Sequence, residues 1–397
     1  MPEPTASTPR EATACFLGDV RLLSGRADSL LSPDVQAAFS AHDIRCVNFE
    51  GAAHHAPAVT RKKAGPALLQ GETAASRVIA AGVNLVTLAN NHAMDYGAEG
   101  LRATLAAFGG ASVPCIGAGL SASLANAPFV VTVNGVKLGF LAFTERQYGT
   151  LAGEPSMGDG KGEGAGTAWI NGSGVLNSIR FLRAQCNHVI VLAHAGLEEV
   201  SQPLPGWRAL YRRFADAGAS VVVGSHPHVP QGWERYKNAL LFYSLGNAAW
   251  EPASDFPDAR SLLLSLTLPR NGVPSFTLKT VVYDASAGQL FFAPHESAAP
   301  LDAMLAAQNA VLLDGARYRA EVRRICLSFY EQIALPDFFT VTGSLPGGGF
   351  QRVKNAAKQV LRKPALNAPL LLSRLENESY RWAVEEALRA AADAANG

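Results

Sequence analysis

Short apolar runs alternate with helical patterns over the first three quarters of the chain. The runs are rich in Val, Ile, Leu and Phe, and several are bounded by Gly or Asn, as buried β-strands are. We expect strands at Thr13–Leu17, Ile44–Phe49, Asn84–Ala89, Val113–Ile116, Val131–Phe143, His188–Ala193, Ser220–Val223, Leu240–Tyr243, Ser261–Leu268, Ser275–Tyr283 and Gln289–Phe292. Between them, apolar stripes at helical spacing run from Trp207 to Phe214 and from Leu101 to Phe108. This alternation predicts an α/β layered architecture.

The pattern changes to helices near Leu301. We expect helices at Leu301–Leu313, Tyr318–Ile333, Phe350–Arg362 and Glu376–Ala394. The chain therefore divides into a disordered N-terminus (1–11), an α/β domain (12–298) and a helical C-terminal extension (299–397). Inside the α/β domain, the Gly-rich stretch Gly149–Gly174 is typical of a long loop, and a lid is one role for it.

Composition narrows the class of protein. Hydrophobic residues make up 48% of the 397 positions and charged residues 17%, a balance that favours a folded core. The net charge of +1 argues against a globally basic nucleic-acid binder. Five scattered cysteines without a C-x-x-C pair predict small core residues rather than a disulfide framework. The sequence has neither an apolar stretch of membrane-spanning length nor a signal-peptide pattern at Met1–Ala14, so we expect a cytoplasmic protein.

The polar residues with chemistry lie where predicted strands end. Six apolar runs end in ligand-type or amide residues: Gly18-Asp19, Asn48-Phe49-Glu50-Gly51, Asn90-Asn91-His92, His194-Ala195-Gly196, Ser225-His226-Pro227-His228 and Leu245-Gly246-Asn247. In α/β sheets, ligands bind just beyond the carboxyl ends of the strands, so these side chains are expected at one rim.

The residue types at these strand ends favour a metal site. Carboxylate, amide and imidazole groups without thiolates suit Zn, Mn, Fe and similar ions, and a carboxylate can bridge two such ions. His226 and His228 flank a single proline, and in an extended segment side chains at i and i+2 share a face. Alone, this H-x-H pair is also typical of two surface histidines; the other strand-end residues make the metal interpretation stronger.

The combination and order of these motifs resemble the poly-gamma-glutamate capsule synthesis protein family (CapA-type), a branch of the calcineurin-like metallophosphoesterase superfamily. The resemblance covers about Thr13 to Trp250 and continues toward Pro294. Its motifs are Gly18-Asp19, Val47-Asn48-Phe49-Glu50-Gly51, the stretch from Asn90 to Gly100, His194-Ala195-Gly196-Leu197-Glu198, Gly224-Ser225-His226-Pro227-His228 and Tyr243-Ser244-Leu245-Gly246-Asn247.

This resemblance implies a four-layer α/β/β/α metallophosphoesterase-like sandwich with a site for two divalent transition metal ions (Mn, Zn or Fe). Asp19 and His228 would hold the first metal, and Glu50 would bridge both. The second metal would be completed by Asn91, His194 and His226. His92 would face the substrate as a general acid or phosphate stabiliser, and Asp95 or Glu198 would orient an imidazole.

The chain also departs from the family pattern. Ala195 stands where the family usually has Trp, Ser225 where it has His, and Ala248 where it has Phe. None of these changes removes an expected ligand. The Trp and the His that the family usually has would, however, both line the cleft. Substrate choice, and the residues that bind the substrate, are therefore open.

Other polar residues have simpler interpretations. We expect His42, His54 and His55 on the surface and His188 at a solvated strand edge. Arg21 or Arg26 could reach a phosphate, although an exposed arginine fits equally. Asn247 fits a cap at the rim or a bond to a ligand.

The resemblance implies a metal-dependent hydrolase that acts on a phosphate ester or a related bond in capsule or surface-polymer synthesis. The alternative is a non-hydrolytic metal-binding accessory protein of a polymer-synthesis complex, because family does not fix function. Polymer-synthesis proteins are possible partners, and no nucleic acid is expected. The basic stretch 350–363 could contact an anionic membrane peripherally, or it could be an ordinary packed helix with a solvated basic face.

Overall fold

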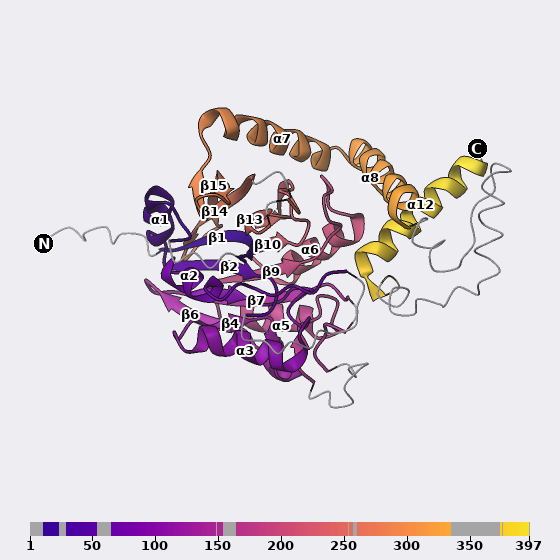
Figure 1. Ribbon diagram of the computed structural model, residues 1–397. Helices are drawn as coiled ribbons and strands as arrows, with labels where there is room; N and C mark the ends of the chain where they lie inside the picture. The colour runs from indigo at the N-terminus through magenta and orange to yellow at the C-terminus, as the bar shows by residue number, and fades with distance from the viewer. Residues whose placement is uncertain are drawn as a thin grey trace, which may run out of the picture.

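Two β-sheets stack face to face, and helices cover the outer side of each (Figure 1). The computed structural model describes residues 11–23, 29–53, 65–147, 149–153, 164–252, 254–256, 260–334, 374 and 376–396. Residues 1–10 of the predicted disordered N-terminus, the histidines at 54 and 55, Arg26 and the basic stretch 350–363 lie outside these ranges, as does part of the Gly-rich loop. Glu11, expected in the disordered N-terminus, begins the first strand instead.

The first sheet carries the N-terminal motifs. Its strand order is β16-β15-β14-β1-β2-β3-β4, and β13 pairs with the end of β1. The strands are β1 (Glu11–Arg21), β2 (Ile44–Phe49), β3 (Leu85–Thr87), β4 (Cys115–Ile116), β13 (Asn247–Trp250), β14 (Arg260–Pro269), β15 (Ser275–Asp284) and β16 (Gln289–Phe292). Since β1 to β4 run parallel, their carboxyl ends lie at the same edge.

The second sheet carries the histidine motifs. Its order is β11-β12-β10-β9-β7-β6, with β7, β9, β10 and β12 parallel. Its strands are β6 (Phe129–Val133), β7 (Val136–Thr144), β9 (His188–His194), β10 (Val221–Ser225), β11 (Trp233–Tyr236) and β12 (Ala239–Phe242). A small separate sheet pairs β5 (Ala118–Gly119) with β8 (Gly166–Thr167).

The apolar core is divided by these layers. One cluster lies between the sheets and includes Phe16, Phe140 and Phe242. A second joins the outer face of the first sheet to α1 (Pro33–Ser40), α2 (Ala74–Ala80) and α3 (Gly97–Gly109). A third joins the outer face of the second sheet to α5 (Val175–Arg183) and α6 (Pro205–Ala217). The predicted four-layer α/β/β/α sandwich is therefore confirmed.

Local sequence explains how these elements begin and end. Helix α6 starts with Pro205, buries Trp207, Leu210, Tyr211 and Phe214, and ends at Gly218 in the left-handed region with φ 115°. At the rim, a Cβ atom on Gly18 would stand 1.8 Å from the carbonyl oxygen of Gly246. Glycine is therefore required before Asp19, because this close approach lets the backbone NH of Asp19 donate to that same oxygen at 3.1 Å.

Some predicted elements need correction. The run Val131–Phe143 is a hairpin rather than one strand, because Asn134 and Gly135 adopt positive φ and form a tight turn between β6 and β7. Strands β5, β8, β11 and β13 and helices α1, α2 and α5 were not predicted, nor was the four-residue α4 (Ala122–Ala125); β8 lies within the stretch expected to be a loop. The cysteines are free thiols, four of them buried, as the composition indicated.

Of the C-terminal helices, the last two that the structure describes pack against the second sheet's helical layer, whereas the first contributes Leu301 and Leu305 to the cluster between the sheets. Helix α7 (His295–Leu313) crosses toward α8 (Gly315–Phe329), which continues as a π-helical turn (Tyr330–Ala334) and lies beside α12 (Glu378–Asn396) (Figure 1). Tyr318, Val322, Ala383 and Ala387 belong to the same apolar cluster as α6. Over the described residues, every helix is too short or too polar to cross a membrane.

Candidate metal centre

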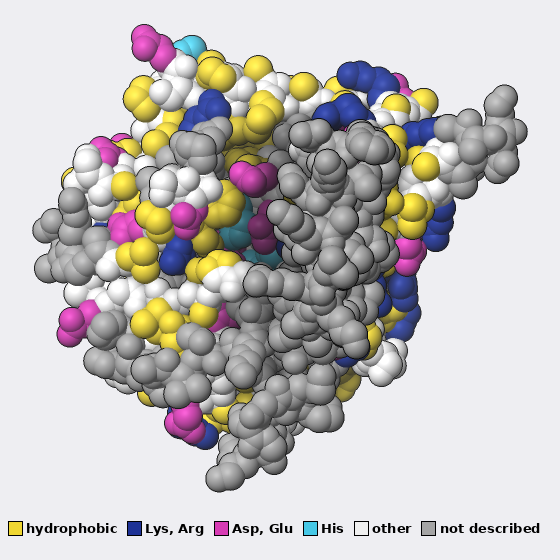
Figure 2. Space-filling view, turned by 45° about the vertical axis from the view of Figure 1, so that its right-hand side comes forward, with side chains coloured by type: hydrophobic (Ala, Val, Ile, Leu, Met, Phe, Trp, Pro, Cys, Tyr) yellow, Lys and Arg dark blue, Asp and Glu magenta, His cyan; other side chains and the backbone are white. Residues whose placement is uncertain are grey.

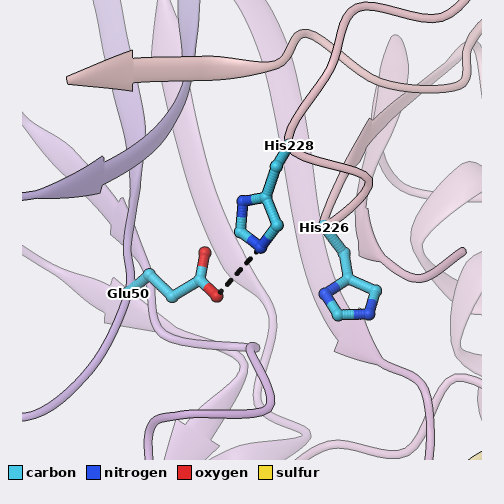
Figure 3. A group of neighbouring side chains, drawn as sticks. All are labelled: Glu50, His226 and His228. Atoms are coloured by element: carbon cyan, nitrogen blue, oxygen red, sulfur yellow. Dashed lines mark ion pairs between the residues drawn. The ribbon is translucent and has the colours of Figure 1, made fainter. Parts of the chain in front are cut away.

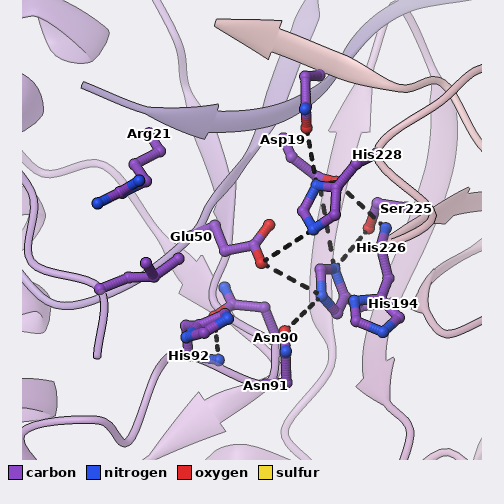
Figure 4. A network of polar contacts seen from close by, with 12 residues as sticks. Asp19, Arg21, Glu50, Asn90, Asn91, His92, His194, Ser225, His226 and His228 are labelled. Atoms are coloured by element: carbon purple, nitrogen blue, oxygen red, sulfur yellow. Dashed lines mark hydrogen bonds and ion pairs between the residues drawn. The ribbon is translucent and has the colours of Figure 1, made fainter. Parts of the chain in front are cut away.

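Five of the predicted site residues form one buried group, which we call the histidine–carboxylate cluster: Asp19, Glu50, His194, His226 and His228. Asp19 comes from β1 and Glu50 follows β2, whereas His194 ends β9 and the other two histidines follow β10. The two sheets thus supply the acids and the imidazoles separately. Acidic and histidine side chains are visible at the bottom of a hollow in Figure 2, and Figure 4 shows the cluster itself.

The spacing within the cluster suits a metal ion. Candidate ligand atoms of Glu50, His226 and His228 lie within 4.8 Å of one another (Figure 3), and so do those of Asp19, Glu50 and His194. Glu50 belongs to both groups, as a bridging carboxylate would. Asp19 and Glu50 have no exposed surface, and burying two carboxylates together is costly unless cations accompany them.

His194 is held by one ring nitrogen. Its Nδ1 lies 3.0 Å from the Ser225 hydroxyl oxygen and 3.2 Å from the Asn48 side-chain nitrogen. Its Nε2 lies 2.9 Å from Asn91 Oδ1 and 3.8 Å from Glu50 Oε1. Fixing Nδ1 in this way aims Nε2 at the centre of the cluster.

His228 is held in the same manner. Its Nδ1 lies 2.9 Å from Asn247 Oδ1, and its Nε2 lies 4.0 Å from Glu50 Oε1. Asn247, for which the sequence left two roles open, therefore orients an imidazole. The rings of Trp250 and Phe256 pack against His228 from the other side, with centroids at 4.7 and 4.5 Å.

His226 is turned the opposite way round. Its Nε2 lies 3.4 Å from Glu145 Oε1, while its backbone NH donates to Asp19 Oδ2 at 3.2 Å. Its Nδ1 is buried and has no hydrogen-bond partner among the described residues. One nitrogen of this ring faces Glu50 and His228 in Figure 3. A buried imidazole nitrogen left without a protein partner fits a metal ligand.

The backbone of the His226–His228 loop is strained. Both histidines adopt positive φ, 97° and 60°, which L-residues occupy at a cost. The two side chains therefore reach one centre through left-handed backbone, and the expectation of simple alternation in an extended segment is wrong. Backbone strain of this kind concentrates at functional sites.

The charges of the cluster follow from its burial. Burial lowers the pKa of His194 well below its usual range, and the neighbouring His226 and His228 lower it further. Burial also lowers the pKa of His228. For His226, burial opposes the proton, but the hydrogen bond and the charge of Glu145, together with the charges of Glu198 and Asp19, outweigh burial and raise the pKa. Neutral imidazoles, as His194 and His228 are at neutral pH, are the form that binds metal.

His92 lies at the edge of the cluster, with its side chain 12% exposed. Its Nδ1 lies 2.7 Å from Asp95 Oδ2, and the same oxygen accepts from the backbone NH of Leu68. Asp95 is thus placed to orient His92, as the sequence predicted for an imidazole. Asn90 supports the loop by donating to the Asn48 side chain and to the carbonyl of Phe49.

Glu198, the other predicted orienting residue, is exposed, and its carboxylate makes no hydrogen bond to an imidazole of the described residues. Burial of its carboxyl group would raise its pKa, but the charges of His226, His228, His92 and Arg374 together outweigh this effect and lower the pKa. The carboxylate therefore contributes negative potential beside the cluster.

Three supporting residues escaped the sequence analysis as site residues: Asn48, Ser225 and Glu145. Asn48 donates to Asp19 Oδ1 at 2.7 Å as well as contacting His194. Glu145 has no exposed surface and directly follows β7. A carboxylate after a predicted apolar run is the pattern that identified Glu50, so the same criterion could have found it.

Other candidates lie elsewhere. Arg21 pairs with Asp255 at 3.0 Å and packs over Trp250. His42 is half-buried and contacts the carbonyl of Ala38. The expectation that His188 is a solvated edge residue is wrong: it is 2% exposed, because β9 is a central strand, and its Nε2 lies 2.6 Å from the carbonyl oxygen of Pro269.

Comparison with known proteins matches the part of the chain that builds this cluster. A family described as bacterial capsule synthesis protein PGA_cap matches residues 15–251. The capsule biosynthesis protein CapA of Bacillus anthracis is 35% identical over 176 residues, which are 43% of this chain and 41% of that protein. The PGA biosynthesis protein CapA of Bacillus subtilis is 32% identical over 198 residues, 49% of each chain. The chain thus spans about half the length of the curated relatives it matches.

Among solved structures, a phosphatase from Mycoplasma pneumoniae is similar with a TM-score of 0.42 and 16% identity. The match covers 71% of this chain and 97% of that one.

Proposed function

The chain belongs to the bacterial capsule synthesis protein family PGA_cap, and on that premise we propose that it is a metal-dependent hydrolase of the metallophosphoesterase type. Its substrate would be a phosphate ester or a related bond in the synthesis of capsule, poly-gamma-glutamate or another surface polymer. The names of the two Bacillus relatives support the biological setting. The geometry of the cluster supports the chemistry.

One observation carries the proposal: each imidazole of the cluster is fixed by one ring nitrogen, with the other directed to the centre. Asn247 fixes His228, Ser225 fixes His194, and Glu145 fixes His226. Metal-binding histidines are held in this way by second partners, which set the tautomer and the ring direction. Three such arrangements around two buried carboxylates fit a metal centre.

The residues present fit two divalent ions. Glu50 would bridge both, His228 and Asp19 would hold one, and the other would be held by Asn91, His194 and His226. Mixed carboxylate, amide and imidazole ligands suit Mn, Zn or Fe. Such ions, when bound, supply Lewis-acid activation of water and stabilisation of negative charge on a phosphoryl group.

His92 would complete the reaction as general acid. Asp95 accepts at Nδ1 and stabilises the protonated ring, so the proton on Nε2 is the one available to a leaving oxygen. Its partial exposure at the edge of the cluster lets a substrate approach it, whereas the metal-binding histidines are buried.

The test combines metal reconstitution with a panel of phosphate mono- and diesters. The wild-type chain loaded with Mn²⁺ should hydrolyse at least one ester class, and chelation should abolish the activity. Asp19→Ala should lose metal and turnover together. Asp216→Ala is the control, because Asp216 pairs with the exposed Lys237 and accepts a hydrogen bond from the Tyr236 hydroxyl rather than from a residue of the cluster. Two bound metals without turnover on any ester would contradict the hydrolase and favour the accessory role.

A further inference from the structure

Glu145 links the metal centre to the far end of the chain. It follows β7, where its backbone NH donates to the carbonyl of His194 at 3.0 Å. Its Oε1 lies 3.4 Å from His226 Nε2 and accepts from Gln147 at 3.0 Å. Its Oε2 accepts from the hydroxyl of Ser379, which is in the first turn of α12. A carboxylate with no exposed surface is thus satisfied by groups from three parts of the chain.

Hydrogen bonds of buried side chains hold the first turn of α12 beside Glu145. Ser379 is 1% exposed and accepts from the indole NH of Trp207 at 2.8 Å. Next to it, the buried Glu378 carboxylate accepts from the backbone NH of Arg146 at 2.7 Å and from the indole NH of Trp169 at 3.1 Å. Glu145 and Arg146, the two residues that follow β7, are therefore both held by consecutive residues of α12, Ser379 and Glu378.

Apolar packing adds to these hydrogen bonds. The ring of Trp382 lies 4.4 Å from that of Trp207, centroid to centroid. The Trp382 ring fills the space that a side chain at position 206 would take, since a Cβ atom on Gly206 would stand 2.2 Å from that ring. The docked position of α12 is therefore specified by shape as well as by polar contacts.

We propose that Glu145 is the positioning residue of His226, and that the C-terminal extension supports the metal centre through Ser379. This inference rests on the proposed metal-dependent function. Holding Nε2 turns Nδ1 toward Glu50 and His228, and a carboxylate partner makes the ring a stronger ligand. Ser379 holds the carboxylate in turn. The chain of contacts runs from α12 through Ser379 and Glu145 to a ligand of the second metal.

Manganese binding to the full-length chain tests the proposal. Equilibrium titration of the apoprotein with Mn²⁺ should resolve two sites in the wild type. Glu145→Ala should weaken one of them by about 10–100-fold, the usual effect of removing such a partner, and leave the other near its wild-type affinity. Ser379→Ala should weaken the same site by up to about tenfold, because a hydrogen bond to a charged group is lost. Ser379→Thr keeps the hydroxyl and should restore binding.

Two further variants separate positioning from loss of stability. Glu234→Gln removes a buried carboxylate that pairs with Arg208 and Arg212 away from the cluster, so it should lower the unfolding temperature while both Mn²⁺ affinities stay unchanged. If Glu145→Ala does not fold, Glu145→Gln is measured in its place. This variant keeps an acceptor of similar shape and should still weaken one site.

The outcomes are distinct. Wild-type affinities in the Glu145 and Ser379 variants would overturn this inference and leave the metal site intact. A wild-type chain that binds no Mn²⁺ would overturn the proposed function and this inference together. Equal weakening of both sites would also contradict the inference, because the Glu145 side chain, which these variants change, contacts only His226 among the three cluster histidines in the described part of the chain.

Discussion

Replacing Glu50 by Gln should stabilise the metal-free protein and reduce the stabilisation that added metal provides. In the apoprotein, Glu50 and Asp19 are two fully buried carboxylates whose oxygens lie within 4.8 Å of each other. Removing one charge relieves their repulsion and stabilises the metal-free fold. The same change weakens the shared bridging ligand, so added metal should stabilise the variant much less than the wild type.

The magnitude follows from the separation of the two charges. At 4.8 Å and an effective dielectric constant of about 20, two like charges repel by about 3.5 kcal/mol. At about 2.1 cal/mol/K per residue, the unfolding entropy of the α/β domain (12–298) is about 0.6 kcal/mol/K. Each kcal/mol therefore moves its unfolding temperature by about 1.7 °C, so metal-free Glu50→Gln should unfold about 6 °C above the metal-free wild type. For the wild type, a metal ion at 100 times its Kd adds about 2.7 kcal/mol.

The assay is thermal unfolding at pH 8, with chelator and with excess Mn²⁺. Glu234→Gln is the control, since it should be less stable than the wild type in both conditions and gain as much from Mn²⁺. The reasoning would be refuted if Glu50→Gln with chelator unfolded below the wild type and then gained the full wild-type increment from Mn²⁺.

Three further predictions concern catalysis, pH and the C-terminal extension. His92→Ala should keep its metal, by elemental analysis, but lose about 10²–10⁴-fold in turnover on an established substrate. Burial would raise the pKa of Glu234, but hydrogen bonds from Arg212 and Arg208 outweigh it and lower the pKa from 4.5 to about 2. Glu234→Gln should therefore cost about 2–3 kcal/mol in chemical denaturation at pH 7, and the difference should vanish as the pH falls from 4.5 through 2, where the wild-type carboxyl is protonated. A chain without residues 299–397 should still bind metal by titration, because the proposed ligands lie between Asp19 and His228, but with one site weakened through the loss of Ser379; complete loss of binding would place the helices within the core fold.

The cluster could be predicted because its residues follow a general rule of α/β sheets. Asp19, Glu50, His194 and His226 each lie at the carboxyl end of a parallel strand, and such ends meet at one edge whatever the loops between them do. The apolar runs therefore located both the layers and the rim. The two-sheet arrangement was predicted from the family resemblance, because the hydrophobic periodicity of the sequence does not determine the order of strands in a sheet.

The supporting contacts could not be predicted in the same way. Ser379 meets Glu145 across 234 positions of the chain, and no local pattern announces a contact between a helix and a strand end so far apart. The left-handed backbone at His226 and His228 belongs to a loop that packs closely against Gly196. A Cβ atom on Gly196 would stand 3.0 Å from the Cγ atom of Pro227. These features come from tertiary packing rather than from residue preference.

Anomalous X-ray diffraction from crystals of the full-length chain soaked in Mn²⁺ tests the central claim most directly. The account predicts two peaks about 3.5–4 Å apart on either side of the Glu50 carboxylate. One should lie against His228 and Asp19, and the other against His194 and the Nδ1 atom of His226. Absence of density in the cluster, or metal bound to His226 through Nε2 in place of the Glu145 contact, would contradict it.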